Sequence, residues 1–463
     1  MVQGPAQPST NPLVHLWDDI RADRAATVPF PPGEFGFSMA RTRRYAADPL
    51  HSLLEYYERF GPVFTLKIFH HNVVVLLGPE ANHHLLVSNA QNFRWREGHF
   101  RDLIPLMGDG LLTTDGAFHR EQRGLMVGAF HKQRIRESLG VIQEEVDRAA
   151  GVFVPGAVVD LYDWTRHLAL RIAMRALFGL DPDAARAGGL DAAGEFESAL
   201  SYYGVDFMLQ MARGPGSAYR RMQQSRARLD ELIHGEIARR RRSGERGADI
   251  LSMLLDATDE HGAALEDRYI RDEVMTLMFA GHDTTTSTTS FLFYELARNP
   301  GVLEDPRVSI EMILDETLRM YPAAHIGPRR SVEPFELLGH TVPGGVHVHY
   351  CSWASHRLPD VWEDPHRFDP LRFTEENKAK LEKGAYVPFG GGSRTCLGMR
   401  FGQAEIGIIA RTILERYRLE LVPGYELDIR HMPTISPRGG LPVTVRRAAS
   451  ASPMLELALD VAA

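Results

Sequence analysis

The chain has 463 residues, 44% of them hydrophobic and 24% charged, which are the proportions of an ordinary globular protein with a sizeable core. Its net charge of −8 argues against a general nucleic-acid binder, because such proteins need an excess of Lys and Arg against phosphate. Two cysteines in a chain of this length exclude a disulfide framework.

No window reaches the roughly 20 apolar residues that span a bilayer. The N-terminal residues are interrupted by Pro and by charge, so they lack the continuous apolar stretch of a signal peptide. We therefore expect a cytoplasmic protein without a transmembrane anchor.

The predicted elements are dominated by helices. Residues 1–13 are rich in Pro, Gln, Ser and Asn and are predicted to be flexible. Two β-rich runs follow at 63–69 and 73–77, joined by a tight turn at 70–72. Residues 80–321 have a helical texture, and a second β-rich stretch covers about 329–370. We predict one domain over 14–448, mainly α with a smaller β portion, and a loose tail at 449–463.

His119 and Arg123 are the first candidate binding residues along the chain. They are four positions apart in "DGAFHREQRGLMVGAF" (115–130), so a helix places them one above the other. A planar Arg fork is well matched to a carboxylate. The alternative is an ordinary surface pair.

A long helix is predicted over 271–300, between an acidic first turn and Asn-Pro. Its middle, Gly281 followed by the threonines 284–286, is poor helix-forming sequence. Thr hydroxyls can also bond back to the carbonyl one turn earlier and bend the helix. Such a run indicates either a functional distortion or a weak spot tolerated in a buried helix. A further candidate ion pair is Glu316 and Arg319, three positions apart on one helix face, with Arg372 downstream as a third member.

The stretch "VPFGGGSRTCLGMRFGQAEI" (387–406) runs three glycines into Cys396 and then an apolar helix. A Walker-type phosphate loop would need a Lys followed by Ser or Thr, and a Rossmann loop would need an acidic residue at a following strand end; neither pattern is present. A helix N-terminus favours the thiolate, which is the form that ligates a metal. Glycines let the backbone lie against something large and flat. The alternative is a structural cysteine at a tight turn.

Four of these patterns together resemble the cytochrome P450 family of haem-thiolate monooxygenases: the His119–Arg123 helix, the long helix, the Glu316–Arg319 helix and the cysteine loop. The cysteine loop matches the family's haem signature as Phe389-x-x-Gly392-x-Arg394-x-Cys396-x-Gly398, and residues 280–285 match its oxygen-binding motif. The four motifs occur in the family's order, and the resemblance covers about residues 30–447. It implies the P450 fold, a triangular helical haem domain with a long central helix across the haem.

The resemblance also implies roles for the candidate residues. Cys396 would be the axial ligand of the iron in haem b, and Phe389 would pack near its sulfur. Propionate contacts would come from His119, Arg123, Arg394 and Arg329, although the neighbouring Arg330 competes for the last role. Ala280 and Gly281 would open a groove over the iron, while Asp283 and Thr284 would organise protons. Gly398 completes the signature, and Glu316, Arg319 and Arg372 would form a buried structural network.

The implied activity is oxidation of a medium-to-large hydrophobic molecule by O2, such as a terpenoid, steroid, fatty acid or polyketide. Two alternatives are a peroxide-using member of the family and a non-catalytic haem-thiolate sensor. The presence of Asp283 and Thr284 counts against both. Candidate pocket residues come from the segments that vary in the family: Leu103, Ile104, Leu106, Met107, Tyr202, Tyr203, Phe207, Met208, Met211, Phe279, Ala280, His325, Ile326, Thr434, Ile435 and Ser436.

No flavin domain is fused to the predicted haem domain, so the electrons are expected from a separate ferredoxin or flavodoxin with its NADPH- or NADH-dependent reductase. A basic docking patch for an acidic partner is predicted beside the cysteine loop at Arg394, Arg400 and Arg411. We expect a monomer that binds no nucleic acid.

Overall fold

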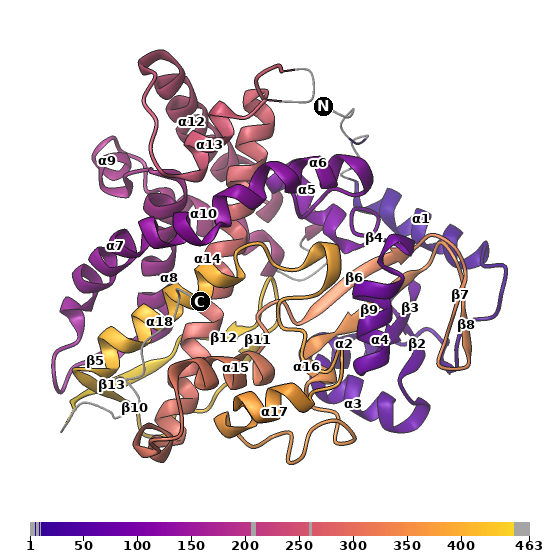
Figure 1. The fold of residues 1–463 in the computed structure, drawn as a ribbon. Coiled ribbons are helices and arrows are strands. Elements are labelled where there is room, and N and C mark those ends of the chain that lie inside the picture. The colour runs from indigo at the N-terminus through magenta and orange to yellow at the C-terminus, as the bar shows by residue number, and fades with distance from the viewer. Residues whose placement is uncertain (1–4, 6–8, 10, 205–209, 259–261, 449–463) are drawn as a thin grey trace.

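Helices fill one side of the molecule, and a six-stranded sheet lies at the other (Figure 1). The computed structural model describes residues 5, 9, 11–204, 210–258 and 262–448. The predicted fold class, mainly α with a smaller β portion, is confirmed. None of the described helices combines the length and apolar character that a membrane crossing requires.

The α-helices are α1 (Pro12–Arg24), α2 (Met39–Ala47), α3 (Pro49–Phe60), α4 (Pro79–His83), α5 (Ile104–Met107), α6 (Gly116–Val127), α7 (Lys132–Ala149), α8 (Leu161–Ile172), α9 (Pro182–Ala187), α10 (Ala192–Ser201), α12 (Ala218–Ser243), α13 (Ile250–Asp256), α14 (Asp267–Arg298), α15 (Ile310–Met320), α16 (Ser352–Ser355), α17 (Glu375–Lys380) and α18 (Met399–Leu414). The strands are β1 (Gly33–Glu34), β2 (Val63–Ile68), β3 (His71–Leu76), β4 (Phe93–Arg94), β5 (Val158–Asp160), β6 (Ile326–Ser331), β7 (Phe335–Leu337), β8 (His340–Val342), β9 (His347–Cys351), β10 (Tyr417–Leu421), β11 (Ile429–Arg430), β12 (Ser436–Pro437) and β13 (Pro442–Arg447). Short helical turns include η1 (His84–Ser88), η3 (His99–Leu103), η6 (Ala173–Leu177) and η7 (Tyr202–Gly204).

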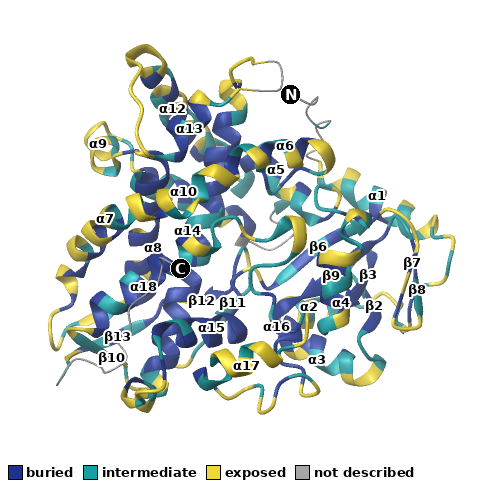
Figure 2. Cartoon of the chain, viewed as in Figure 1, coloured by how far each residue is buried: buried dark blue, intermediate teal, exposed yellow. Residues whose placement is uncertain are grey.

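Helix α14 is the long central helix, and it extends four residues further at its N-terminus than the predicted 271–300. It is buried on nearly every side along Ile270–Leu296 (Figure 2). Such all-round burial suits a helix that runs through the core rather than along the surface. Three of its threonines, Thr284, Thr286 and Thr288, donate their hydroxyls to the carbonyl one turn earlier; Thr286 does so to His282 at 2.8 Å.

The six-stranded sheet has the order β1-β2-β3-β9-β6-β4. The hairpin β2–β3 turns at Phe69, whose φ of 52° is left-handed. Strand β2 ends one residue earlier than predicted and β3 begins two residues earlier, so the turn is shorter than the predicted 70–72. Strand β9 then pairs in parallel with β3 and in antiparallel with β6, which places Arg329 opposite Val348. Residues of β6 therefore sit beside the centre of the sheet.

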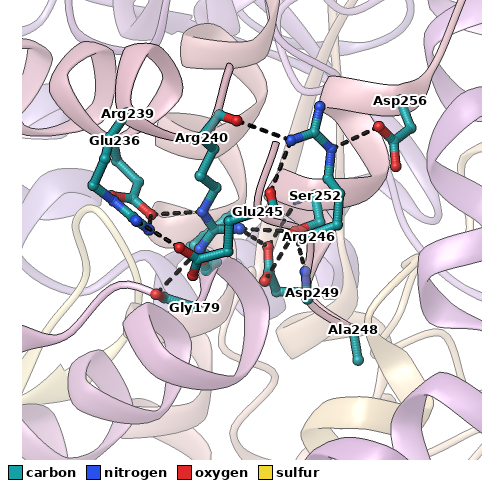
Figure 3. Close-up of polar contacts among 12 residues, drawn as sticks. Gly179, Glu236, Arg239, Arg240, Glu245, Arg246, Ala248, Asp249, Ser252 and Asp256 are labelled. Carbon is teal, nitrogen blue, oxygen red and sulfur yellow. Dashed lines mark hydrogen bonds and ion pairs between the residues drawn. The ribbon is translucent and has the colours of Figure 1, made fainter. Parts of the chain in front are cut away.

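The basic run 239–242 at the end of α12 includes one arginine, Arg240, that is packed into the protein. The Arg240 side chain is almost fully buried and bonds Glu236 at 2.5 Å and Asp249 at 2.7 Å (Figure 3). It also donates to the Phe178 carbonyl at 2.9 Å. One arginine thus joins α12 to the segment before α13 and to the residues after η6, and the acidic neighbours offset the cost of burying its charge.

Candidate functional site

The cysteine loop leads directly into α18, whose N-cap residue is Gly398. The Cys396 N–H donates to the Phe389 carbonyl at 2.9 Å, which closes the loop into a tight turn. Cys396 is exposed, whereas Cys351, the other cysteine, is buried. Phe389 packs partly buried against the main core. The loop therefore does not pack Cys396 into the core as a structural cysteine.

The sequence suggested that the glycines of this loop make room for a large, flat ligand. The structure gives another explanation for two of them. A Cβ at Gly392 would lie 2.4 Å from the Leu86 carbonyl oxygen, and one at Gly391 would lie 3.2 Å from Leu86 Cβ. Gly392 also has a φ of 59°. The two glycines are thus required by the close approach of the loop to η1, so room for a flat ligand is not needed to explain them.

Two effects act in opposite directions on the pKa of the Cys396 thiol. Desolvation by the surrounding protein raises it and is the larger effect. The Gly398 N–H at the start of the helix and the Arg123 guanidinium lower it. A metal ion on the sulfur would favour the thiolate further.

Helix α14 is less buried along one short strip of its surface, which we call the open strip. Every residue from Ile270 to Leu296 is buried except Ala280, Gly281 and Thr284. These three lie at i, i+1 and i+4, which is one face of the helix. A Cβ at Gly281 would only reach ordinary contact with the Leu177 side chain, at 3.7 Å. The oxygen-binding motif is therefore the part of the buried helix that faces open volume.

The two proposed proton-handling side chains of α14 have separate partners. Thr434 donates its hydroxyl to Asp283 Oδ2 at 2.8 Å, in a buried bond. Thr284 donates to the Ala280 carbonyl at 2.5 Å. Asp283 and Thr284 therefore do not bond each other in this arrangement, and Asp283 is tied to the turn before β12 (Ser436–Pro437).

A cavity of about 430 Å³ lies next to the cysteine loop. Three of the four predicted propionate residues, His119, Arg329 and Arg394, line it. Arg94, Arg120 and Asp115 also line it, so its ionisable lining is mostly cationic. A hollow of this size with convergent cations fits a carboxylate-bearing ligand.

Arg329 rather than Arg330 faces this cavity. The Arg329 side chain is buried on β6, stacked with its guanidinium carbon 3.5 Å from the centre of the Trp95 ring. Burial lowers its pKa to about 10. No carboxylate among the described residues lies within ion-pair distance of it, and it donates to the Pro328 carbonyl at 2.8 Å. Arg330 instead donates to the Gly345 carbonyl at 2.9 Å.

Arg394 points inward from the cysteine loop. It donates to the Thr114 carbonyl at 2.6 Å and pairs with Asp115 at 2.7 Å. Its guanidinium is therefore engaged inside the protein. The docking patch that combined it with Arg400 and Arg411 stays a prediction. Arg400 is exposed and Arg411 is half-buried on α18.

Helix α6 supplies the remaining two predicted contacts. His119 is buried, and burial lowers its pKa to about 3, with further lowering by the neighbouring Arg394 and Arg123. It is therefore a neutral hydrogen-bonding group at neutral pH. Arg123 does not line the cavity; it donates to the Thr395 carbonyl at 2.6 Å and braces the cysteine loop.

Glu316 and Arg319 form a bidentate pair on α15, with N–O distances of 2.7 and 2.8 Å and no solvent exposure. Arg372 lies 3.5 Å from the same carboxylate. Arg319 also donates to the carbonyls of His356 and Pro365, at 2.8 and 2.9 Å. The charges are buried, but they are paired and hydrogen-bonded as such charges must be.

His356 is a residue that sequence reasoning missed. Its Nδ1 lies 3.2 Å from the Arg319 carbonyl, and its Nε2 accepts the Val387 N–H at 2.9 Å. Because burial lowers its pKa to about 3, the ring is neutral and donates from Nδ1. It links the buried ion pair to the start of the cysteine loop. Isolated histidines carry no local signal for such a contact.

The predicted pocket residues are spread over several elements. Phe207 and Met208 lie outside the described residues. Ile104, Leu106, Met107, Tyr202, Tyr203, Phe279, His325, Thr434, Ile435 and Ser436 are buried, whereas Leu103, Met211, Ala280 and Ile326 are half-buried. None of the described candidates lines the cavity beside the cysteine loop. Their role in substrate binding stays a prediction.

Comparison with known proteins identifies the family. The cytochrome P450 family model matches residues 29–307 and 308–439. A cyclooctat-9-en-7-ol 5-monooxygenase of Streptomyces melanosporofaciens is 32% identical over 357 residues, which cover 71% of this chain and 77% of the relative. A putative cytochrome P450 139 of Mycobacterium bovis is 28% identical over 431 residues, or 86% of this chain and 98% of the relative.

Solved structures agree. The haem domain of cytochrome P450DA is similar with a TM-score of 0.81 and 25% identity, covering 91% of this chain and 98% of the other. A cyanobacterial CYP120A1 with bound retinoic acid has the same fold, with a TM-score of 0.80 over 91% of this chain and all of the other. This chain belongs to the cytochrome P450 family, and it is a haem-binding oxidoreductase related to monooxygenases.

The described residues fit the haem of that family. Cys396 is not packed in the core, and a cation on its sulfur would offset the desolvation that raises the pKa of its thiol. Arg329 is a buried cation without a carboxylate partner among the described residues, beside a cavity lined by two further predicted propionate contacts. Haem would supply an iron ion for the sulfur of Cys396 and two carboxylates, one of which could pair with Arg329.

Proposed function

We propose that this P450 is a monooxygenase that uses O2 and externally supplied electrons to oxidise a hydrophobic substrate at haem b. The observation that carries the proposal is the open strip of Ala280, Gly281 and Thr284 on a helix that is otherwise buried from Ile270 to Leu296. Poor helix formers and a strip that is not buried weaken the helix at this point. A reaction site on that face explains why these residues are present.

Cys396 would hold the iron as its axial ligand, with Phe389 beside it. Arg329, Arg394 and His119 would hold the propionates, because they converge on one cavity, while Arg123 would brace the loop from Thr395. When bound, the haem supplies the activation of dioxygen, which the side chains alone cannot perform. The protein's part is to position the haem and the substrate, to exclude water from the site and to move protons.

Proton delivery would fall to Asp283 and Thr284. Thr434 holds the Asp283 carboxyl away from Thr284, so a proton relay through Asp283 requires its side chain to turn from Thr434 toward the open strip. The Thr284 hydroxyl is already on that strip. Positioned groups of this kind contribute about 100-fold to 10,000-fold to proton-transfer steps.

The substrate is proposed to be a medium-to-large hydrophobic molecule of the terpenoid, steroid, fatty acid or polyketide classes. The name of one relative supports a largely hydrocarbon substrate, since that enzyme is a cyclooctat-9-en-7-ol 5-monooxygenase. Buried Phe279 and Ile435 and half-buried Ile326 are the proposed apolar lining. Electrons are proposed to come from a separate ferredoxin or flavodoxin with its reductase.

Turnover of a hydrophobic compound library with a surrogate ferredoxin and its reductase tests the proposal. Compounds are first selected by the shift they cause in the Soret band. We expect an oxidised product that depends on NADH or NADPH and on O2, and a sharp loss of product in Thr284→Ala. Product formed equally well from peroxide alone would favour a peroxygenase, and binding without turnover would favour a sensor.

A further inference from the structure

Three histidines from distant parts of the chain meet at one end of the sheet. His71 is the first residue of β3, His99 the first of η3 and His347 the first of β9. Because β3 and β9 run in parallel, with Val73 opposite His347, their first residues lie at the same edge. The ring centres are 4.7 Å apart for His71 and His347, 4.9 Å for His99 and His347, and 5.6 Å for His71 and His99.

Their ring nitrogens are largely without hydrogen bonds. His71 is 5% exposed, and neither of its ring nitrogens has a partner among the described residues. His347 is 1% exposed, and within the same described part of the chain its Nδ1 has no partner. Leaving a buried polar group unpaired destabilises the folded protein. An apolar side chain would fill this space without that penalty. The unpaired ring nitrogens therefore indicate that a ligand binds to them.

One member of the cluster has the outer partner that metal-binding histidines need. The Asp19 carboxylate, on α1, lies 3.0 Å from His347 Nε2. With Nε2 donating to Asp19, His347 Nδ1 is left as the ligating nitrogen, as in a carboxylate–histidine–metal arrangement. Arg101 donates to both oxygens of Asp19, at 3.0 and 2.9 Å, and fixes the carboxylate in place.

We propose that His71, His99 and His347 form a zinc-type site, separate from the haem, in which Asp19 orients His347. Their candidate ligand atoms all lie within 4.8 Å of one another. In a tetrahedral site with Zn–N bonds of about 2.0–2.1 Å the nitrogens are about 3.4 Å apart, so ring movements on the order of 1 Å complete the site. Three neutral imidazoles with water in the fourth position suit Zn²⁺ among the abundant divalent ions.

The physical setting favours binding without release of protons. Burial lowers the pKa of His71 and His347, and the charges of neighbouring histidines lower that of His71 further. Both rings are therefore already in the neutral form that a metal requires. A bound ion would tie together β3, β9 and η3, and through Asp19 it would hold α1 against the sheet.

Equilibrium dialysis of the tag-free holoenzyme against ZnCl2, followed by elemental analysis, tests the site. Iron is measured in the same sample so that the haem is counted separately. We expect about one Zn²⁺ per chain and a raised Tm in the wild type. His71→Ala and His99→Ala should lose the zinc, and the control His234→Ala, at an exposed position of α12, should keep it.

Asp19→Asn provides a second, graded test, because loss of an outer partner weakens metal affinity by about 10–100-fold. The Soret spectrum of each variant shows whether it has folded around haem. His99 is only half-buried, so His99→Ala remains informative if His71→Ala fails to fold. The proposal is overturned if the wild type retains no zinc, or if His99→Ala retains as much as the wild type and His234→Ala.

Discussion

Thr434 donates its hydroxyl to the carboxyl group of Asp283 across 151 residues of sequence, at 2.8 Å and out of contact with solvent. The bond joins the middle of α14 to the turn before β12. It holds the acid of the oxygen-binding motif away from the open strip on which Thr284 lies. Thr434 therefore sets the resting position of the acid, and we infer that it controls how readily Asp283 takes part in proton delivery.

Replacing Thr434 by Val removes this bond while keeping the shape of the side chain. A side-chain hydrogen bond is worth about 0.5–1.5 kcal/mol, so we expect the product formed per NADH consumed to change by about twofold or more. Thr434→Ser keeps the hydroxyl and should remain close to the wild type. Measuring product and NADH in the same reaction checks this, and equal coupling in Thr434→Val would show that the bond is only structural.

The two adjacent arginines of β6 give a matched comparison for haem retention. Arg329 faces the cationic cavity, whereas Arg330 bonds the Gly345 carbonyl. Loss of a charge-assisted bond to a propionate should weaken haem binding by about tenfold or more in Arg329→Met. Arg330→Met should change it much less. Haem transfer to excess apomyoglobin measures the two rates, and the opposite order would assign the propionate to Arg330.

Glu316→Gln should destabilise the fold strongly, because it leaves the Arg319 charge buried without its partner. We expect a loss of about 3–5 kcal/mol in the free energy of unfolding. Glu420→Gln is the control, since Glu420 pairs with Arg446 at the surface and such pairs contribute little. Urea-induced unfolding of both variants checks this. Equal midpoints would mean that the buried pair adds no net stability.

Glu405 should make stability depend on pH. Burial raises its pKa from 4.5 to about 8, so the folded chain holds a proton that the unfolded chain releases. The free energy of unfolding should therefore fall as pH rises from about 4.5 to 8 and then level off.

Glu405→Gln is neutral at every pH and removes this loss. It should match the wild type at about pH 5 and exceed it near pH 9 by a few kcal/mol, since one pKa unit corresponds to about 1.4 kcal/mol. Tm values of both proteins across this range measure the effect. Two parallel curves would show that Glu405 does not titrate as described.

The sequence was informative about the site where the chemistry is local. The position of Cys396 before a helix, the poor helix formers around Gly281 and the spacing of Glu316 and Arg319 are all readable within a few residues, and the structure places each on the expected element. The long helix was predicted to within four residues of its start and two of its end.

Contacts between distant segments could not be predicted. The bond from Thr434 to Asp283, and the link of His356 between Arg319 and Val387, depend on how separate elements pack. The glycines of the cysteine loop were read as room for a ligand, yet the close approach of Leu86 explains Gly392. Likewise, the helix N-terminus at Cys396 was visible in the sequence, but the opposing cost of desolvation was not.

The central claim is that Cys396 ligates a haem iron as a thiolate. The carbon monoxide difference spectrum of the reduced protein tests it most directly. We expect the long-wavelength Soret band typical of thiolate-ligated haem in the wild type and in Cys351→Ser, because Cys351 is buried on β9. Cys396→Ser should lose that band. A wild type without the band, or a Cys396→Ser variant that keeps it, would contradict the account.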